Sequence, residues 1–363
     1  MRVLYFSQDY SPHDHRFLSA LAGADHEVFY LRLTHARRQV EDRPVPSRIQ
    51  QVQWNGAGEQ FRWRAVPRLR SGLLRILREL RPDLVHAGPI QTCAFLAALS
   101  GFRPLLTMSW GFDLMQDADR NTWWRWVTRY TLKRSAFFVS DARVTCDKAI
   151  SFGMPSGNTA VFPWGVDLDH FKPAGIPAAS PFVLFCNRSW EPRYGVDVLA
   201  RAFVKVAHER PDATLLLLGG GSMGGSLRQI LMNGNVLDRV QFAGYVSQAD
   251  LPRWYRMASL YISPSHVDGS SVSLMEALAC GLPVLVSDIP ANREWVTDGA
   301  NGWLFPDGDA QALAGSILAL LDQPDDLTRA RVHARQCARE RADWSRNFAV
   351  LLEAYRQAVQ VRH

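Results

Sequence analysis

Short apolar segments typical of buried strands alternate with segments of helical periodicity along most of the chain. This alternation constrains the fold more than any other feature. Strands that alternate with helices form parallel sheets with helices on both faces, so the first half is predicted to be a doubly wound α/β domain. Its strands are expected at 3–6, 26–31, 83–87, 104–108 and 137–140, and its helices at about 16–22, 69–80, 92–100, 123–133 and 147–152.

The same alternation restarts after a turn-rich linker at 162–177. At 363 residues, the chain is long enough for two domains. We therefore predict two doubly wound domains that face one cleft, with ligands bound at the carboxyl ends of the strands. The strands of the second domain are expected at 182–185, 214–218, 240–242, 260–262 and 283–286, and later helices at 309–322 and 344–361.

Positive charge is concentrated in one part of the chain. Basic residues outnumber acidic ones by 41 to 35, and the stretch 35–82 holds 11 Arg residues against four acids. Such a stretch could attract nucleic acid, an anionic membrane surface or an anionic substrate, or it could be a solvated face. No nucleic-acid module pattern accompanies it, so we expect no nucleic-acid partner. Aromatic residues stand beside arginines at 61–64, which favours a membrane surface.

The five cysteines indicate a reducing compartment, because they are odd in number and none forms a CxxC pair. The apolar stretch at the N-terminus is too short for a secretory signal, and no apolar run reaches the roughly 18–20 residues of a membrane span. We expect a cytoplasmic protein, which could be peripheral at the inner face of the membrane.

Chemically useful side chains are densest in the segment 263–281. A strand is expected to end just before it, and a helix is expected from about 271 to 279. Free backbone N–H groups at the start of such a helix suit a pyrophosphate. The residues beside that helix start are Gly269, Ser270 and Ser271.

Two acids lie in the same segment. Glu276 would lie one and a half turns into the helix, where its two oxygens could accept hydrogen bonds from the vicinal hydroxyls of a ribose. Asp268, on the preceding loop, could meet sugar hydroxyls or a developing positive centre. From spacing alone, a helix-surface acid and a turn-forming aspartate are equally good interpretations.

The order of these motifs resembles one family. The segment 268–276 is similar to the acid-x7-Glu signature of the retaining nucleotide-sugar glycosyltransferases of family 4, the group 1 glycosyl transferases of GT-B fold. The resemblance covers the C-terminal domain almost completely and the N-terminal domain more loosely. Further segments match in the family's order, at 162–173, 186–197, 218–221, 242–246 and 298–305.

The resemblance implies a GT-B architecture with two Rossmann-like domains around an interdomain cleft. Residues 1–170 would form the acceptor-binding domain and residues 171–343 the nucleotide-sugar-binding domain. The last helix, in 344–363, would cross back to the N-terminal domain.

The resemblance also implies roles for individual residues. Arg188 falls where the family has a phosphate-contacting arginine, and Glu276 where an acid holds the ribose. Tyr194 stands where the family has a lysine, so Arg193 is expected to supply the second cation. Asp268 replaces the more frequent first glutamate and is one methylene shorter.

Short loops are expected to contact the donor sugar and the base. The residues that replace the family's Gly-aromatic-Gly beside the sugar are Gly269, Ser270 and Ser271. Those expected to contact the base through their backbone are Gly244, Tyr245 and Val246. The glycine run 219–225 fits neither a P-loop nor GxGxxG, so it is interpreted as structural, and a nicotinamide dehydrogenase is poorly supported.

The N-terminal domain is expected to hold the acceptor. A polar loop, 7–15, takes the place of the family's glycine-rich loop and leads into a helix that is predicted to open near residue 16. For each candidate, capping, loop polarity or packing is an open structural alternative. The acceptor-side candidates are His13, Asp14, Arg16, His86 and Asp113.

The reaction implied is transfer of a sugar from a nucleoside-diphosphate sugar to a hydroxyl of a glycan, a lipid-linked or a small-molecule acceptor, with retention of configuration. Arg188, Arg193 and the helix start would stabilise the leaving diphosphate, with Asp268 also in a catalytic role. No acid or histidine cluster has metal-ligand spacing, so no metal and no further cofactor are expected. Two alternatives stay open: a same-fold sugar-nucleotide epimerase or disaccharide synthase, and a non-catalytic membrane-associated binding protein.

Overall fold

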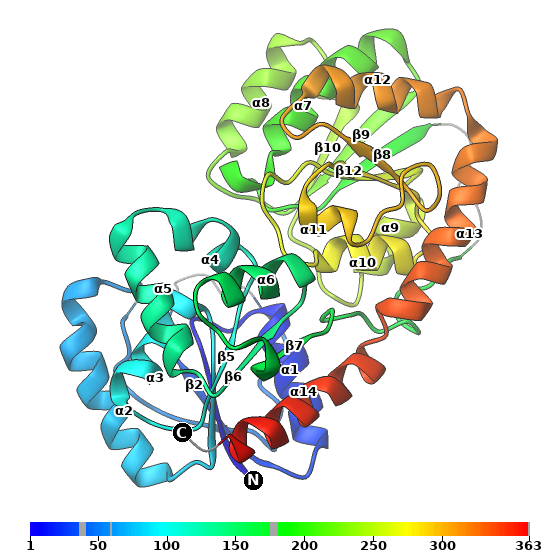
Figure 1. The fold of residues 1–363 in the computed structure, drawn as a ribbon. Helices are drawn as coiled ribbons and strands as arrows, with labels where there is room; N and C mark the ends of the chain where they lie inside the picture. The colour runs from blue at the N-terminus through cyan, green and yellow to red at the C-terminus, as the bar shows by residue number, and fades with distance from the viewer. Residues whose placement is uncertain (36–40, 59, 175–180, 362–363) are drawn as a thin grey trace. The chain divides into compact units, whose positions relative to one another are not determined.

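The chain forms two compact units in the computed structural model, which describes residues 1–35, 41–58, 60–174 and 181–361 (Figure 1). One unit comprises Met1–Phe162 together with Phe348–His363, and the other comprises Pro163–Asn347. The end of the predicted linker and two arginines of the basic stretch, Arg37 and Arg38, lie outside the described residues.

The first unit is built on a parallel seven-stranded sheet in the order β3-β2-β1-β4-β5-β6-β7. Its central strands are fully buried, because helices cover both faces. Chain order reverses next to β1, as doubly wound sheets require. The strands are β1 (Arg2–Ser7), β2 (Glu27–Arg32), β3 (Gln50–Gln51), β4 (Leu84–Ala87), β5 (Leu105–Met108), β6 (Phe137–Ser140) and β7 (Thr159–Val161).

The helices of this unit bury apolar stripes against the sheet. In α2, the predicted helical spacing is confirmed, since Leu69, Leu73, Ile76 and Leu77 are the buried residues. The helices are α1 (Pro12–Gly23), α2 (Val66–Leu80), α3 (Phe95–Ser100), α4 (Phe112–Met115), α5 (Thr122–Arg134) and α6 (Arg143–Ser151).

Helix α1 begins four residues before the predicted position, so the prediction of a polar loop up to residue 15 is wrong. Ser11 caps the helix, and its side chain and that of Asp14 satisfy each other's backbone N–H groups in a capping box. Pro12 at the first helical position fixes the backbone for helix entry. His13, Asp14 and Arg16 therefore lie on the first turns of a helix.

The second unit contains a parallel six-stranded sheet in the order β10-β9-β8-β11-β12-β13. The strands are β8 (Phe182–Cys186), β9 (Ala213–Leu218), β10 (Val240–Gly244), β11 (Leu260–Ser263), β12 (Val284–Ser287) and β13 (Trp303–Phe305). The helices are α7 (Val196–Glu209), α8 (Gly224–Asn233), α9 (Leu251–Met257), α10 (Val272–Ala279), α11 (Pro290–Arg293), α12 (Ala310–Leu321) and α13 (Pro324–Arg341). This arrangement confirms the predicted second α/β domain.

Helix α14 (Trp344–Gln360) begins in the second unit and, from Phe348 on, belongs to the first. Its Tyr355 is fully buried, and the Tyr355 hydroxyl lies 2.8 Å from Nδ1 of His86 on β4. The predicted return of the last helix to the N-terminal domain is therefore present in the structure.

Several elements were not predicted. The largest is α13, whose 18 residues are rich in arginine and carry little apolar surface, so their helical period is weak. Strands β3, β7 and β13 are only two or three residues long. None of the helices that the structure describes is both long enough and apolar enough to cross a membrane.

Candidate functional site

The C-terminal unit brings Arg188 and Asp268 together, although 80 positions separate them in the chain. Arg188 follows β8, and Asp268 lies on the loop between β11 and α10. Strands β8 and β11 are parallel neighbours, so their carboxyl ends lie at the same edge of the sheet. Sheet order thus creates the site at the edge where doubly wound folds bind ligands.

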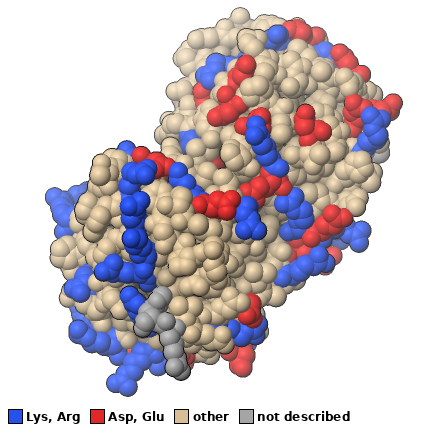
Figure 2. Space-filling model, viewed as in Figure 1, with Lys and Arg blue, Asp and Glu red and all other residues tan. Residues whose placement is uncertain are grey.

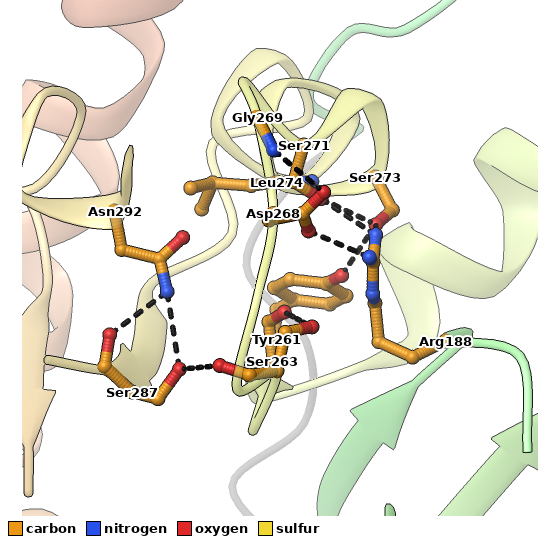
Figure 3. Close-up of polar contacts among 11 residues, drawn as sticks. Arg188, Tyr261, Ser263, Asp268, Gly269, Ser271, Ser273, Leu274, Ser287 and Asn292 are labelled. Carbon is orange, nitrogen blue, oxygen red and sulfur yellow. Dashed lines mark hydrogen bonds and ion pairs between the residues drawn. The ribbon is translucent and has the colours of Figure 1, made fainter. Parts of the chain in front are cut away.

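The Arg188 guanidinium is held on several sides (Figure 3). Its Nη2 donates to Oδ2 of Asp268 at 2.6 Å, and its Nη1 donates to the hydroxyls of Ser271 at 2.8 Å and Ser273 at 3.0 Å. The Tyr194 ring centroid lies 4.3 Å from the guanidinium carbon, which is a cation–π distance. We call these four neighbours of Arg188 the arginine cage.

Burial and charge act against each other in this ion pair. The side chains of Arg188 and Asp268 are only 11% and 16% exposed. Burial lowers the pKa of Arg188, but Asp268 and the other acidic groups around the guanidinium together raise it by more, so the guanidinium stays charged. Burial raises the pKa of Asp268, and the charge of Arg188 only partly offsets this. The pair therefore places one fixed cation, the Arg188 guanidinium, beside the carboxylate of Asp268.

Two buried polar atoms at this edge have no hydrogen-bond partner among the described residues: Nε of Arg188 and Oδ1 of Asn187. Buried polar atoms are nearly always paired, so unpaired ones indicate a place for a ligand or water. Both atoms come from the segment between β8 and α7, which is the predicted phosphate-binding loop.

Glu276 connects to the same loop through a tyrosine. It is buried on α10, and its Oε2 accepts a hydrogen bond from the Tyr255 hydroxyl at 2.8 Å. That hydroxyl in turn accepts from Nδ2 of Asn187 at 2.8 Å. The interpretation of Glu276 as a helix-surface acid is therefore wrong, whereas its role towards a ribose stays a prediction.

The two loops of the site are fastened to each other. The backbone N–H of His266 donates to the carbonyl of Arg193 at 3.0 Å. Gly195 has φ +58°, and a Cβ at that position would lie 2.1 Å from the carbonyl oxygen of Pro264. Only glycine allows this approach. The contact keeps the segment 187–195 against the loop that carries Asp268.

The loop before α10 is also fixed from the side of β12. Ser287 donates from its hydroxyl to the carbonyl of Ser265 at 2.5 Å, and Nδ2 of Asn292 donates to the carbonyl of Ser287 at 2.8 Å (Figure 3). Ser270 accepts from the indole N–H of Trp295 at 2.9 Å. These contacts make the start of α10 a rigid part of the site.

Helix α10 starts where the sequence predicts. Ser271 is its N-cap, and its hydroxyl accepts from the backbone N–H of Leu274 at 3.4 Å. The backbone N–H of Gly269 donates to Oδ1 of Asp268 at 3.1 Å. The N-terminus of α10 therefore lies directly beside the Arg188 guanidinium.

The predicted base-contacting segment lies at the end of β10. Gly244 has φ +69°, and its carbonyl accepts from the N–H of Gly219 at 2.6 Å. The Tyr245 side chain is 59% exposed and lies against Gly220, where an added Cβ would be 2.9 Å from its ring. Val246 packs at the edge of the core. The structure thus places the glycine run beside this segment.

The acceptor-side acids have structural partners in the first unit. Asp14 accepts from the Tyr5 hydroxyl at 3.0 Å and from the backbone N–H of Ser11 at 2.9 Å. Asp113 accepts from the N–H of Ile90 at 2.9 Å, besides the hydroxyl of Ser109. Burial raises the pKa of both acids to about 6, and their hydrogen bonds act in the opposite direction.

The acceptor-side histidines also pack against aromatic rings. His13 has its ring centroid 5.5 Å from that of Trp110. His86 is fully buried, and burial lowers its pKa to about 3, so its ring is neutral. These contacts favour structural roles for His86 and the two acids, and contact with an acceptor stays a prediction for all five candidates.

Sequence reasoning missed three members of the site: Asn187, Tyr255 and Ser273. Asn187 stands next to Arg188, and Ser273 lies one helical turn before Glu276, so both could have been found from the motif segments. Tyr255 carried no such signal, because only the packing of α9 against α10 brings it to Glu276. Among the residues that the structure describes, no group of three or more acids, histidines and cysteines could hold a metal ion.

Comparison with solved structures identifies the fold. The chain matches a sucrose-phosphate synthase from Thermosynechococcus elongatus with a TM-score of 0.82 at 18% identity, over 98% of this chain and 99% of that one. It matches Anabaena HepE in complex with UDP and glucose with a TM-score of 0.78, also at 18% identity and over 98% and 99% of the two chains. At this identity the likeness concerns the fold, which is that of the GT-B proteins.

Sequence comparison then identifies the family. Residues 13–170 match the model for Glycosyltransferase Family 4, and residues 180–323 match the model for group 1 glycosyl transferases. The chain belongs to family 4 of the glycosyltransferases.

Curated relatives cover part of the chain. A phosphatidyl-myo-inositol mannosyltransferase of Mycolicibacterium smegmatis is 36% identical over 207 residues, which are 55% of this chain and 52% of that protein. A D-inositol 3-phosphate glycosyltransferase of Thermobispora bispora is 33% identical over 227 residues, 58% of this chain and 52% of that protein. The chain thus spans about half the length of the curated relatives it matches.

Proposed function

We propose that this protein transfers a sugar from a nucleoside-diphosphate sugar to an acceptor hydroxyl. The observation that carries the proposal is the caged, buried Arg188 guanidinium beside the N-terminus of α10, at the carboxyl ends of β8 and β11. A guanidinium suits phosphate oxygens, and a helix N-terminus favours negative charge. Membership of family 4 and the UDP complexes of its structural neighbour support the same donor class.

In the reaction, the bond between the anomeric carbon and the diphosphate oxygen breaks, and a bond to the acceptor oxygen forms on the same face of the sugar. The electron pair of the broken bond stays with the diphosphate, and a departing diphosphate oxygen takes up the proton of the acceptor hydroxyl. Arg188, with Arg193 as second cation, and the α10 N-terminus neutralise the departing charge, so we propose chemistry without a metal. Glu276 holds the ribose.

Lipid-linked or other glycan acceptors fit the relatives best. The names of the two relatives refer to phosphatidyl-myo-inositol and to D-inositol 3-phosphate. By analogy, we propose a polar acceptor in glycolipid or glycan biosynthesis. The five cysteines are free thiols in the structure, as expected for the cytoplasm that we propose as its location.

A surface of the first unit supports peripheral binding to an anionic membrane. Basic side chains crowd this unit (Figure 2), and α5 carries four basic residues and no acid. On α5, Trp123 and Trp126 are 49% and 47% exposed, and their rings stack with centroids 4.9 Å apart. Trp63, at the start of the basic α2 region, has its ring 5.5 Å from that of Trp123. Exposed indoles on a basic helix suit a lipid–water interface.

The donor is tested with a panel of UDP-, GDP- and ADP-sugars. We expect one member to raise the melting temperature and to release its nucleoside diphosphate when an acceptor extract is added. Arg188→Ala should abolish both effects, whereas Asp326→Asn, which removes an exposed acid paired with Arg329 on α13, should change neither. If the wild-type protein binds no nucleotide sugar of the panel, the proposal fails.

A further inference from the structure

We propose that Asp268 is a positioning residue, which orients the Arg188 guanidinium for the diphosphate. This inference rests on the proposed function, because it assigns a task within the same site.

Each carboxylate oxygen of Asp268 already accepts one hydrogen bond from within the protein. Oδ2 accepts from Nη2 of Arg188 at 2.6 Å, and Oδ1 accepts from the backbone N–H of Gly269 at 3.1 Å. In Figure 3 the carboxylate is turned towards the guanidinium. The bond to Arg188 is charge-assisted, which makes it the stronger of the two and ties the carboxylate to the guanidinium.

The rest of the arginine cage supports the same task. Two hydroxyls, from Ser271 and Ser273, accept from Nη1, and the Tyr194 ring covers the guanidinium carbon. Each of these contacts restricts the orientation of the planar guanidinium. The Nε of Arg188 is buried and has no partner in the described part of the chain, and Nη2 uses only one of its two N–H groups, so two of the five donors are left for a ligand.

The length of the acid explains why it acts on the arginine. An aspartate is one methylene shorter than the glutamate that the family resemblance leads one to expect here. In this chain that length places the carboxylate within 2.6 Å of Arg188. A long, flexible side chain that is already oriented loses less conformational freedom when the diphosphate binds. We infer that this gain outweighs the repulsion between the carboxylate and the diphosphate.

The test uses UDP, GDP and ADP, because free nucleoside diphosphates carry no sugar. Titration calorimetry measures their affinity for the wild-type protein, Asp268→Asn, Arg188→Gln and the double variant. We expect Asp268→Asn to lower the affinity for a nucleoside diphosphate at least tenfold. We expect the double variant to bind no more weakly than Arg188→Gln alone, because Asp268 acts through Arg188.

Two results would overturn the inference. Unchanged or tighter diphosphate binding by Asp268→Asn would mean that the acid does not orient the arginine, and additive losses in the double variant would mean that it acts independently. Asp326→Asn serves as the matched control, since it removes an acid from an exposed ion pair with Arg329 in the same unit.

A folding defect can be separated from a binding defect. Asp268→Asn leaves a buried cation without its partner, whereas the double variant removes both charges. Urea unfolding is therefore measured for every variant. If Asp268→Asn does not fold, Ser273→Ala, which removes another anchor of the guanidinium, replaces it under the same criteria. Wild-type protein that binds none of the three nucleotides would refute the proposed function too, whereas wild-type binding with unaltered variants refutes the positioning role alone.

Discussion

Replacing His86 by glutamine should flatten the dependence of stability on pH. His86 is fully buried on β4, next to the Tyr355 hydroxyl of α14. Its Nε2 has no hydrogen-bond partner among the residues that the structure describes. Burial lowers the pKa of His86 to about 3 from its ordinary value near 6.5, because a charged imidazolium would be desolvated there.

The size of the effect follows from proton linkage. Between pH 6.5 and 3, the unfolded chain binds a proton at His86 and the folded chain does not, so the free energy of unfolding falls as the pH falls. Each pH unit in this window costs about 1.4 kcal/mol. From pH 7 to pH 5, His86 alone therefore lowers stability by about 2 kcal/mol.

Urea unfolding of the wild-type protein and of His86→Gln at pH 7 and pH 5 measures this difference. We expect the wild-type protein to lose about 2 kcal/mol more than the variant, since glutamine does not titrate. Asp14 and Asp113 have raised pKa values, so acid stabilises the folded state at these sites in both proteins, and their effect cancels in the difference. Equal losses for the two proteins would refute the assignment of a neutral, buried histidine.

Three further outcomes are expected. Replacing both Trp123 and Trp126 by alanine should weaken sedimentation with anionic vesicles at least tenfold while thermal stability stays within a few degrees, because both indoles are about half exposed. Glu276→Gln should lower the affinity for a nucleoside diphosphate by about tenfold and leave that for inorganic pyrophosphate unchanged, since the proposed partner is the ribose. Gly195→Ala should lower the melting temperature markedly, because its Cβ would lie 2.1 Å from the carbonyl of Pro264.

The fold was largely predictable because it depends on local patterns. Strand-type segments such as 260–262 and the helix 69–80 have the predicted class and nearly the predicted bounds. Helix α1 begins at Pro12 because a capping box outweighs the polar character of its first turn, which the pattern of apolar residues does not register. Helix α13 was not predicted, because its buried residues are mainly alanines, which give only a weak apolar periodicity among the arginines.

The site was predictable only as far as its residues lie within motifs. Arg188 and Asp268 were each proposed from their own segment. Their direct contact could not be predicted, because it depends on β8 and β11 being neighbours and neither segment determines the order of strands in the sheet. Tyr255 reaches Glu276 from another helix for the same reason.

Hydrogen-bond partners explain why chemically similar acids differ in their prospects as ligand-binding groups. Asp14 and Asp113 are polar residues near strand ends, as Asp268 is, but the first two are buried, whereas the side chain of Asp268 is 16% exposed. The partners of the first two are mainly backbone N–H and hydroxyl groups that cap or brace their own unit. Asp268 instead faces a cation whose Nε is still unpaired, so its neighbourhood has unused hydrogen-bonding capacity for an anion. Asp268 therefore differs from the two acids of the first unit in having as its partner a cation with an unpaired donor.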